Sequence, residues 1–229
     1  MIYSTENIAS LFDSIAPQYD KLNHLMSLGI DRRWRRKAVR EIVDVSSPLS
    51  VLDVATGTGD FLAAIAKKSG PESQLTGVDL SEKMLAVARQ KLPASIHLEV
   101  GNVEKLRFPD NSFDRVSVAF GIRNFNHLEQ GLSEMCRVLR PAGKLVILEL
   151  SYPDNPFLLL GYKCYAFHIL PFWGSLLAGN REAYSYLPAS IMKFPKPDVM
   201  IPKLKSAGFS SVSVRRFSAG ICLMYVAEK

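Results

Sequence analysis

Residues 51–60 of the chain read VLDVATGTGD, a short apolar run that ends in the turn Gly57-Thr58-Gly59. The β-branched residues of the run predict a buried strand, and the apolar spacing from Asp60 onward (DFLAAIAKK) predicts a helix. Glycines let the backbone turn tightly and let a ligand approach without meeting a Cβ atom. The stretch therefore predicts a ligand site between a strand and a helix, with a plain tight turn as the alternative.

The alternation of strand and helix continues along the chain. Strands are predicted at residues 50–56, 75–80, 96–101, 113–120 and 144–150, and helices are predicted to begin at Asp60, Ser81 and His127. Two further strands, 211–217 and 221–227, follow a helix that starts near Pro197. This spacing predicts a parallel sheet covered on both faces. We therefore expect an α/β fold with a mostly parallel seven-stranded sheet and an antiparallel last strand.

A length of 229 residues fits one large domain. We expect a single domain over 1–229, made of a helical arm (1–48), a cofactor-binding core (49–151), a cap and helix (152–208) and closing strands (209–229). Hydrophobic residues make up 48% of the chain and charged residues 22%, which excludes wholesale disorder. The net charge of +6 favours anionic surfaces but falls short of a dedicated nucleic-acid binder, so no nucleic-acid partner is expected.

The three cysteines, Cys136, Cys164 and Cys222, are far apart and show neither a CxxC pair nor a Cys/His ligand spacing. This pattern argues against a disulfide scaffold or a structural zinc and predicts a reducing compartment. The first ten residues, MIYSTENIAS, have no basic segment before an apolar run. We expect a cytoplasmic protein.

Residues 157–178 form the most apolar stretch of the chain. Lys163, His168 and Pro171 interrupt it, and a membrane span would avoid a central Lys and His. We therefore predict helices of a cap over a pocket, in peripheral contact with a membrane surface. The basic run RRWRRK at 32–37 has the same implication, because cations flanking an aromatic ring suit anionic lipid. A solvated helix face and RNA binding are the alternatives.

The acid at the end of the second predicted strand narrows the choice of cofactor. Asp79 lies 20 residues after Gly59, where a carboxylate can bind both hydroxyls of an adenosine ribose. NAD and S-adenosylmethionine (SAM) would both use such an acid. The dinucleotide pattern needs a small residue at Leu62, however, and Asp60 at the start of the helix would repel a pyrophosphate. SAM presents an ammonium and a sulfonium, which acids attract, so SAM is favoured over the cofactor of a NAD-linked oxidoreductase.

Over roughly residues 48–151 the chain resembles the class I SAM-dependent methyltransferases, which have a Rossmann-like fold. The resemblance implies that the cofactor-binding residues are Asp53, Gly57, Thr58, Gly59, Asp79, Asn102, Val103 and Ala119. The first-strand acid and the glycine loop would hold the methionine moiety, the second-strand acid the ribose, and the end of the third strand the adenine.

Three of these positions carry qualifications. Asp53 has an alternative role, hydrogen bonding the backbone of the loop. Asn102 stands where an acid is often found, although its amide can still pair with an adenine edge. Ala119 stands where relatives often have a serine, so only its backbone would contribute. Outside these eight positions, Thr56 stands where many relatives have a glycine.

Further segments make the resemblance more specific. FDSIAPQYDKLN at 12–23, FGIRNF at 120–125 and AYSYLPASI at 183–191 are similar to the quinone-biosynthesis C-methyltransferases, which act on demethylmenaquinol or on the benzoquinol precursor of ubiquinone. This likeness covers nearly the whole chain, arm and cap included. It implies SAM-dependent C-methylation of a prenylated quinol, most consistently demethylmenaquinol. No metal is expected, because a phenolate ring carbon attacks the methyl group without one.

Arg123 is the expected catalytic residue, because its guanidinium can stabilise a quinolate oxygen at the carboxyl edge of the sheet. A salt bridge to Glu149 is the alternative role. Asn124 and Tyr19 are its expected companions, and Tyr184 and Tyr186 are candidate pocket walls. The sequence leaves two alternative functions. One is a SAM-dependent methyltransferase that acts on another small aromatic or lipid acceptor, and the other is a non-catalytic SAM-fold binding protein. A homodimer is also left open.

Overall fold

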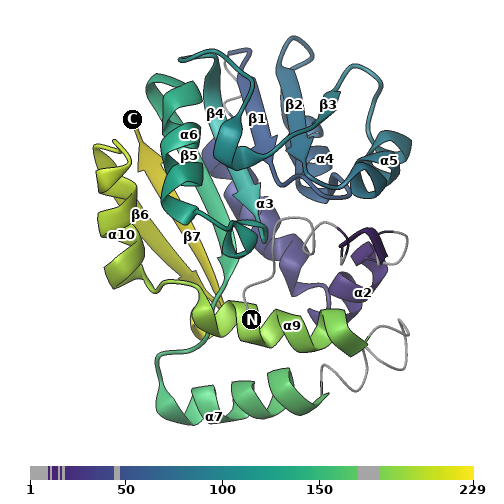
Figure 1. The fold of residues 1–229 in the computed structure, drawn as a ribbon, viewed down its shortest axis with the longest axis vertical. Coiled ribbons are helices and arrows are strands. Elements are labelled where there is room, and N and C mark those ends of the chain that lie inside the picture. Colours follow the sequence, from purple (N-terminus) through teal and green to yellow (C-terminus); the bar gives the residue numbers. More distant parts are fainter. Residues whose placement is uncertain (1–9, 11, 15, 17–18, 44–46, 170–180) are drawn as a thin grey trace.

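The computed structural model of the chain describes residues 10, 12–14, 16, 19–43, 47–169 and 181–229. One seven-stranded sheet runs through it in the order β3-β2-β1-β4-β5-β7-β6 (Figure 1). The strands are β1 (Ser50–Val54), β2 (Gln74–Asp79), β3 (His97–Val100), β4 (Phe113–Ala119), β5 (Leu139–Leu150), β6 (Ser211–Phe217) and β7 (Cys222–Glu228). β1 to β5 pair in parallel, and β7 pairs antiparallel with both β5 and β6. The predicted fold class is confirmed.

Helices cover both faces of this sheet. They are α2 (Tyr19–Met26), α3 (Ile30–Ile42), α4 (Asp60–Ala66), α5 (Glu82–Lys91), α6 (Leu128–Val138), α7 (Pro156–Cys164), α9 (Arg181–Lys193) and α10 (Pro197–Ser206). Shorter turns are η2 (Val103–Lys105), η3 (Ile122–Asn124), η5 (Ser218–Gly220) and the π-helical η4 (Tyr165–Ile169). One apolar cluster joins α3, α4 and α5 to the sheet, and a second joins α6 and α10 to the opposite face.

The strands read as continuous apolar runs because they are buried on both sides. In β5, Leu145 and Ile147 belong to the α6–α10 cluster, whereas Val146 and Leu148 belong to the α3–α4–α5 cluster. Successive side chains of a strand point to opposite faces, so the two clusters take alternate residues. This pattern is that of a parallel sheet between two helical layers.

Most predicted elements agree with the structure to within one or two residues at their ends. The fifth strand is the exception, because the turn expected before it at 141–143 lies inside the strand. β5 already pairs with β4 at Leu139, and the register of the two strands then shifts between Phe113 and Arg115. Ala142 has a left-handed φ of 62°. The residues 141–143 are therefore an irregularity inside a longer β5, and the prediction that the strand starts at 144 was wrong.

The arm and the cap region meet at the carboxyl edge of the parallel strands. α2, α9 and α7 lie at this edge in Figure 1. Tyr165 of η4 donates a hydrogen bond to the Met26 carbonyl (2.8 Å), and Tyr186 of α9 donates one to Asn124 Oδ1 (2.9 Å). Ligands of such sheets bind at this edge. No helix within the described residues is long and apolar enough to cross a membrane; part of the apolar stretch, 170–180, lies outside those residues.

Candidate active site

The loop between β1 and α4 contains two glycines that the structure requires for different reasons. Gly57 has φ 57°, and a Cβ atom built there would meet nothing within 4 Å. Gly59 has φ 80°, and its Cβ atom would lie 2.8 Å from Leu92 Cδ1. Both conformations favour glycine. Gly57 thus leaves space beside the loop, whereas Gly59 permits close packing of the loop against α5.

Asp53, at the carboxyl end of β1, is fully enclosed. Its Oδ1 accepts a hydrogen bond from Ser117 Oγ of β4 (2.6 Å), and its Oδ2 accepts one from Thr56 Oγ1 of the loop (2.7 Å). Burial raises the pKa of Asp53 to about 6, although these two hydrogen bonds favour its charged form. The alternative role expected for Asp53, bonding the loop, is thus realised through a side chain of the loop rather than through its backbone.

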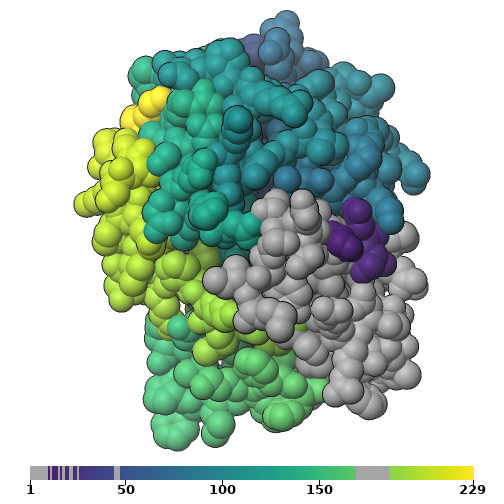
Figure 2. Space-filling model, viewed as in Figure 1, coloured from purple at the N-terminus to yellow at the C-terminus, as the bar shows by residue number. Residues whose placement is uncertain are grey.

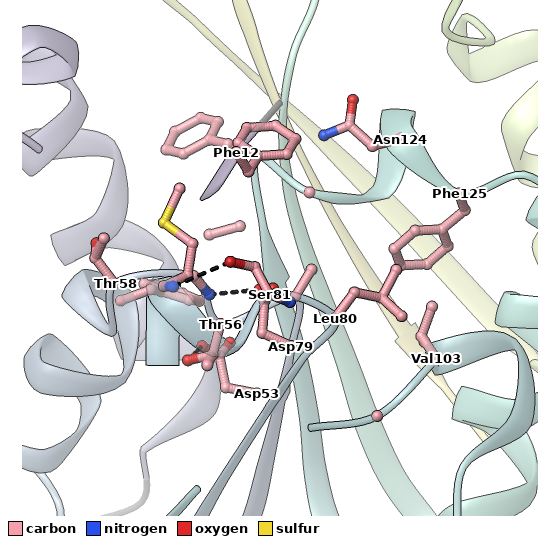
Figure 3. A pocket seen from close by; sticks show the side chains of 18 of the residues that line it. Phe12, Asp53, Thr56, Thr58, Asp79, Leu80, Ser81, Val103, Asn124 and Phe125 are labelled. Carbon is pink, nitrogen blue, oxygen red and sulfur yellow. Dashed lines mark hydrogen bonds between the residues drawn. The ribbon is translucent and has the colours of Figure 1, made fainter. Parts of the chain in front are cut away.

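Asp79 ends β2 directly beside the glycine loop. Its Oδ2 accepts a hydrogen bond from Gly57 N (2.7 Å), and its Oδ1 accepts one from Ser81 N (2.8 Å). Figure 3 shows Asp79 between Thr56 and Ser81 at one wall of a cavity. Burial raises the pKa of Asp79, and the backbone N–H groups that it binds oppose the shift. The second-strand acid therefore contacts the glycine loop, and its expected role in binding ribose stays a prediction.

This cavity, which we call the loop cavity, collects all the expected cofactor residues except Gly59. Phe12 lies across the cavity from Asp53 and Asp79, and Asn124 and Phe125 lie on its other side (Figure 3). Asn102 Oδ1 is already engaged, because it accepts a hydrogen bond from Glu104 N (2.9 Å) at the start of η2. Val103 is buried and Ala119 ends β4, and both line the cavity.

A second cavity, which we call the tyrosine cavity, adjoins the first. Apolar and aromatic residues dominate its walls, among them Met26, Trp34, Leu150, Tyr162, Tyr165, Leu187 and Ile191. Tyr19, Arg35 and Phe120 line both cavities. Burial raises the pKa of Tyr162 to about 12, so this phenol is neutral near pH 7. A small aromatic molecule in the tyrosine cavity would lie next to a ligand in the loop cavity.

Arg123 projects from η3 into the wall of the tyrosine cavity. Its Nη1 lies 2.9 Å from Glu149 Oε1 and also donates to the Phe120 carbonyl, and its Nε donates to Ser190 Oγ (3.2 Å). The side chains of Arg123 and Glu149 are 4% and 0% exposed. The alternative role expected for Arg123, a salt bridge to Glu149, is therefore present, and Arg123 is also one of the residues that line the tyrosine cavity.

The expected companions of Arg123 lie around it. Tyr19 is enclosed where the two cavities meet, and burial raises its pKa although the nearby Arg123 and Arg35 charges lower it. Asn124 lines the loop cavity and accepts the hydrogen bond from Tyr186. The side chain of Tyr184 lies outside the described residues.

The arm is fastened to the glycine loop by charged and polar contacts that the sequence did not reveal. Asp20 of α2 accepts a hydrogen bond from Thr58 Oγ1 (2.5 Å) and pairs with Lys91. His24 Nε2 lies 3.1 Å from Asp60 Oδ2, and Lys91 Nζ lies 3.0 Å from Asp60 Oδ1. The arm thus covers the loop cavity and contributes to its walls. Among the described residues no group of three or more His, Cys, Asp or Glu could hold a metal ion.

Several lining residues were not identified from the sequence as parts of a site. Phe12 lies in a quoted motif but had no assigned role, and Ser81 and Met84 belong to the predicted second helix. Arg35 belongs to the basic run that was interpreted as a lipid-binding surface. Helical spacing from the buried Trp34 and Ala38 was the available signal that part of this run faces inward.

Comparisons with known proteins agree with this arrangement. A model of the ubiE/COQ5 methyltransferase family matches residues 1–229. The chain is 46% identical over 230 residues to the demethylmenaquinone methyltransferase of Bacteroides fragilis, with 98% of this chain and 93% of the relative covered. It is 44% identical over 229 residues to the ubiquinone/menaquinone biosynthesis C-methyltransferase UbiE of Geobacter sulfurreducens, with 98% and 89% covered.

Solved structures share the fold at much lower identity. A SAM-dependent methyltransferase from Thermotoga maritima has a TM-score of 0.70 at 18% identity, covering 96% of this chain and 98% of that one. The [4+2]-cyclase SpnF has a TM-score of 0.72 at 16% identity, covering 99% and 97%. At these identities the likeness concerns the fold alone, because one fold can carry different reactions.

Replacing Asp53 by Asn should change how stability depends on pH. A carboxyl whose pKa rises from 3.8 to about 6 on folding binds more protons in the folded chain, so it lowers the free energy of unfolding as pH rises through this window. The full effect is about 3 kcal/mol. The free energy of unfolding of Asp53→Asn, relative to the wild type, should therefore increase between pH 4 and pH 7, as urea denaturation at several pH values measures. A difference that does not vary with pH would contradict the enclosed carboxyl.

Replacing each loop glycine by alanine should separate backbone strain from packing. The left-handed φ costs Gly57→Ala and Gly59→Ala about 1 kcal/mol each. Gly59→Ala should lose roughly 1–3 kcal/mol more, because its Cβ atom collides with Leu92. Chemical denaturation at one pH measures both variants, and each is the other's control. Equal losses would show that α5 does not pack on the loop as described.

Proposed function

The chain belongs to the ubiE/COQ5 methyltransferase family, and we propose that SAM occupies the loop cavity and the quinol ring occupies the tyrosine cavity. The chain is a SAM-dependent C-methyltransferase of quinols in menaquinone or ubiquinone biosynthesis. The adjoining cavities, with Tyr19, Arg35 and Phe120 in the walls of both, carry the proposal. Demethylmenaquinol is the proposed acceptor, because the relative from Bacteroides fragilis is named for it.

The loop cavity fits SAM by its charges and its shape. Asp53, Asp79 and Glu104 line it, and acids attract the ammonium and sulfonium groups. The open space beside Gly57 lets a ligand approach the backbone closely. In this proposal Asp79 would bind the ribose hydroxyls, and Asn102 and Val103 would contact the adenine. Bound SAM would supply an electrophilic methyl group and leave as S-adenosylhomocysteine, and the ring carbon that receives the methyl group would give up its proton to water.

Arg123 would stabilise the negative charge of the quinolate. Its contacts with Glu149, Phe120 and Ser190 use Nε and Nη1 and hold the guanidinium in place. We propose that Nη2 points its N–H groups toward a quinolate oxygen in the tyrosine cavity. Burial strengthens such an interaction because little water competes for it. Arg123 does not act as the base: burial favours its neutral form, but its neighbours, Glu149 above all, together outweigh burial and raise the pKa of Arg123 above its usual value.

Tyr19 and Asn124 would orient the ring. The raised pKa of Tyr19 keeps its hydroxyl protonated near neutral pH, so Tyr19 donates a hydrogen bond rather than taking a proton. Asn124 lies on the loop-cavity side of η3 and is held by Tyr186. Together they would fix the distance between the ring carbon and the methyl group, which accounts for much of the rate of such a reaction.

A test of the acceptor uses purified protein, SAM and a reduced short-chain demethylnaphthoquinol, with the product identified by mass. The expected product is heavier by one methyl group on the ring carbon. SAM binding without any methylated product from naphthoquinol or benzoquinol would favour a binding protein, and methylation of only unrelated phenols would favour a different acceptor.

Removing the Arg123 guanidinium should slow turnover while SAM still binds. Arg123→Gln alone would leave Glu149 charged and buried, at a cost of about 3–5 kcal/mol, so the variant to use is Arg123→Gln/Glu149→Gln. Turnover should fall on the order of 10²- to 10³-fold, as when a group that stabilises an oxyanion is removed. The dissociation constant of SAM should change little, as calorimetry measures.

The matched control is Arg137→Gln/Glu134→Gln, which removes another Arg–Glu pair (2.7 Å) whose residues line neither cavity. It should turn over like the wild type. A folded Arg123/Glu149 variant with wild-type turnover would contradict the role of Arg123 in catalysis.

We also propose that α7, η4 and the turn before α3 rest on an anionic membrane surface. Large apolar side chains are exposed there, most of all Phe157 (85%), Leu28 (84%) and Leu160 (70%). The hydrogen bond of Tyr165 to Met26 holds η4 against the turn that carries Leu28. α7 forms the lower end of the molecule in Figure 2. A prenylated quinol resides in a bilayer, so this surface would bring the tyrosine cavity close to its substrate.

The exposed cations of α3 complete this surface, but the basic run contributes only part of it. Arg32, Arg33, Arg36 and Lys37 are exposed. Trp34 is buried, and its Nε1 donates to Ser218 Oγ (3.1 Å), while Arg35 faces the cavities. Helical periodicity turns these two residues inward, so only the four exposed cations of the run would contact lipid.

Vesicle sedimentation tests the membrane surface. The chain should bind vesicles that contain phosphatidylglycerol more tightly than vesicles of phosphatidylcholine, and less tightly at high salt. Arg32→Gln/Arg33→Gln should weaken binding on the order of tenfold or more, at about 1 kcal/mol for each cation. Phe157→Ser/Leu160→Ser should weaken binding at every salt concentration.

The control for the lost charge is Lys67→Gln/Lys68→Gln, which removes two exposed cations at the end of α4, away from the carboxyl edge of the sheet. It should bind like the wild type. If all three variants bind vesicles equally well, the proposed membrane surface is wrong.

A further inference from the structure

The charges around the loop cavity are unbalanced for a ligand like SAM. Asp53, Asp60, Asp79 and Glu104 line the cavity, and Arg35 is the lining residue with a cationic side chain among those that the structure describes. SAM carries a carboxylate as well as its ammonium and sulfonium. The acids attract the two cationic groups but repel the carboxylate. A cation must therefore meet the carboxylate, and Arg35 is in place for it.

Arg35 is held firmly by its surroundings. It lies on the inner side of α3, its Nη1 donates to Asp31 Oδ2, and Asp60 Oδ2 lies 3.7 Å from the same Nη1. Its guanidinium carbon lies 5.1 Å from the centre of the Phe120 ring. The side chain is 12% exposed. These contacts fix the plane of the guanidinium before any ligand arrives. Ligand binding would therefore cost little side-chain conformational entropy at Arg35.

One edge of this guanidinium is not used. Arg35 Nε is buried and has no hydrogen-bond partner among the described residues. A buried donor without a partner is unfavourable and calls for an explanation. Nε and Nη2 together form a fork that matches the two oxygens of a carboxylate. The contacts with Asp31 and Asp60 involve Nη1, at the other corner of the group.

We propose that Arg35 binds the carboxylate of the methionine moiety of SAM through Nε and Nη2. The inference rests on the proposed placement of SAM in the loop cavity. It is consistent with the place of Arg35, which lies beside Asp60 at the glycine loop and beside Phe120 after β4. Arg35 lines both cavities. It would therefore hold the methionine end of the cofactor at the place where the loop cavity meets the tyrosine cavity.

A pair of ligands separates this role from a structural one. S-adenosylhomocysteine carries the carboxylate and ammonium, whereas 5′-methylthioadenosine carries the same adenosine and sulfur without either group. Isothermal titration of both ligands against the wild type and Arg35→Gln forms a cycle. Arg35→Gln should bind S-adenosylhomocysteine roughly 10- to 100-fold more weakly, as expected for the loss of a hydrogen bond to a charged group. Its affinity for 5′-methylthioadenosine should not change.

Two further variants guard against misfolding. Arg35→Lys keeps a charge but lacks the fork, so it should lose part of the affinity for S-adenosylhomocysteine and none for 5′-methylthioadenosine. Arg35→Gln/Asp31→Asn removes the carboxylate that would otherwise lose its partner and should retain the selective effect. Arg40→Gln, an exposed position of the same helix, is the control and should bind both ligands like the wild type.

The outcomes are distinct. An equal loss of both ligands in Arg35→Gln, or no loss of either, overturns the inference, because Arg35 would then act on the shape of the cavity or not at all. If the wild type binds neither ligand, the placement of SAM fails and the inference fails with it. A loss confined to the ligand with the carboxylate supports Arg35 as its anchor.

Discussion

The hydrogen bond from Ser117 of β4 to Asp53 of β1 spans the point at which the order of the strands reverses. β2 and β3 continue the sheet on one side of β1, and β4 and β5 continue it on the other. The connections that leave β1 and β4 therefore diverge, which opens a crevice at the carboxyl edge. Asp53 holds both strands and, through Thr56, the glycine loop. The position of the loop cavity follows from this junction.

The arm completes a site that the sheet only begins. Without α2, the glycine loop and Asp60 would face solvent at the edge of the sheet. Asp20 and His24 reach Thr58 and Asp60, and Lys91 of α5 links the two carboxylates. These partners offset the charge that Asp60 brings to the first turn of α4. The arm encloses the cavity by the same contacts, and enclosure strengthens every charge interaction inside it.

The sequence predicted what local patterns determine and missed what only tertiary contacts determine. Asp79 ends β2 as the strand pattern predicted, and it lies beside the loop after β1 because parallel strands end at one edge. The salt bridge of Arg123 to Glu149 was foreseen as its alternative role, since a cation after β4 can reach the acid at the end of β5. Composition alone did not divide the basic run at 32–37 into an inner and an outer side, which the helical spacing of the buried Asp31, Trp34 and Ala38 does. Contacts such as Asp20 with Thr58 leave no local signal.

In the proposed role of Arg123, its pairing with Glu149 would make the substrate chemistry depend on geometry more than on net charge. A buried ion pair has almost no net charge, so it cannot attract a quinolate from a distance. Its dipole, however, is fixed by Ser190 and by the Phe120 carbonyl, and a fixed dipole needs no reorganisation when negative charge appears beside it. Glu149 thus lowers the cost of burying Arg123 in an apolar cavity and aims its guanidinium. The apolar cavity, rather than the charge, would select the quinol ring.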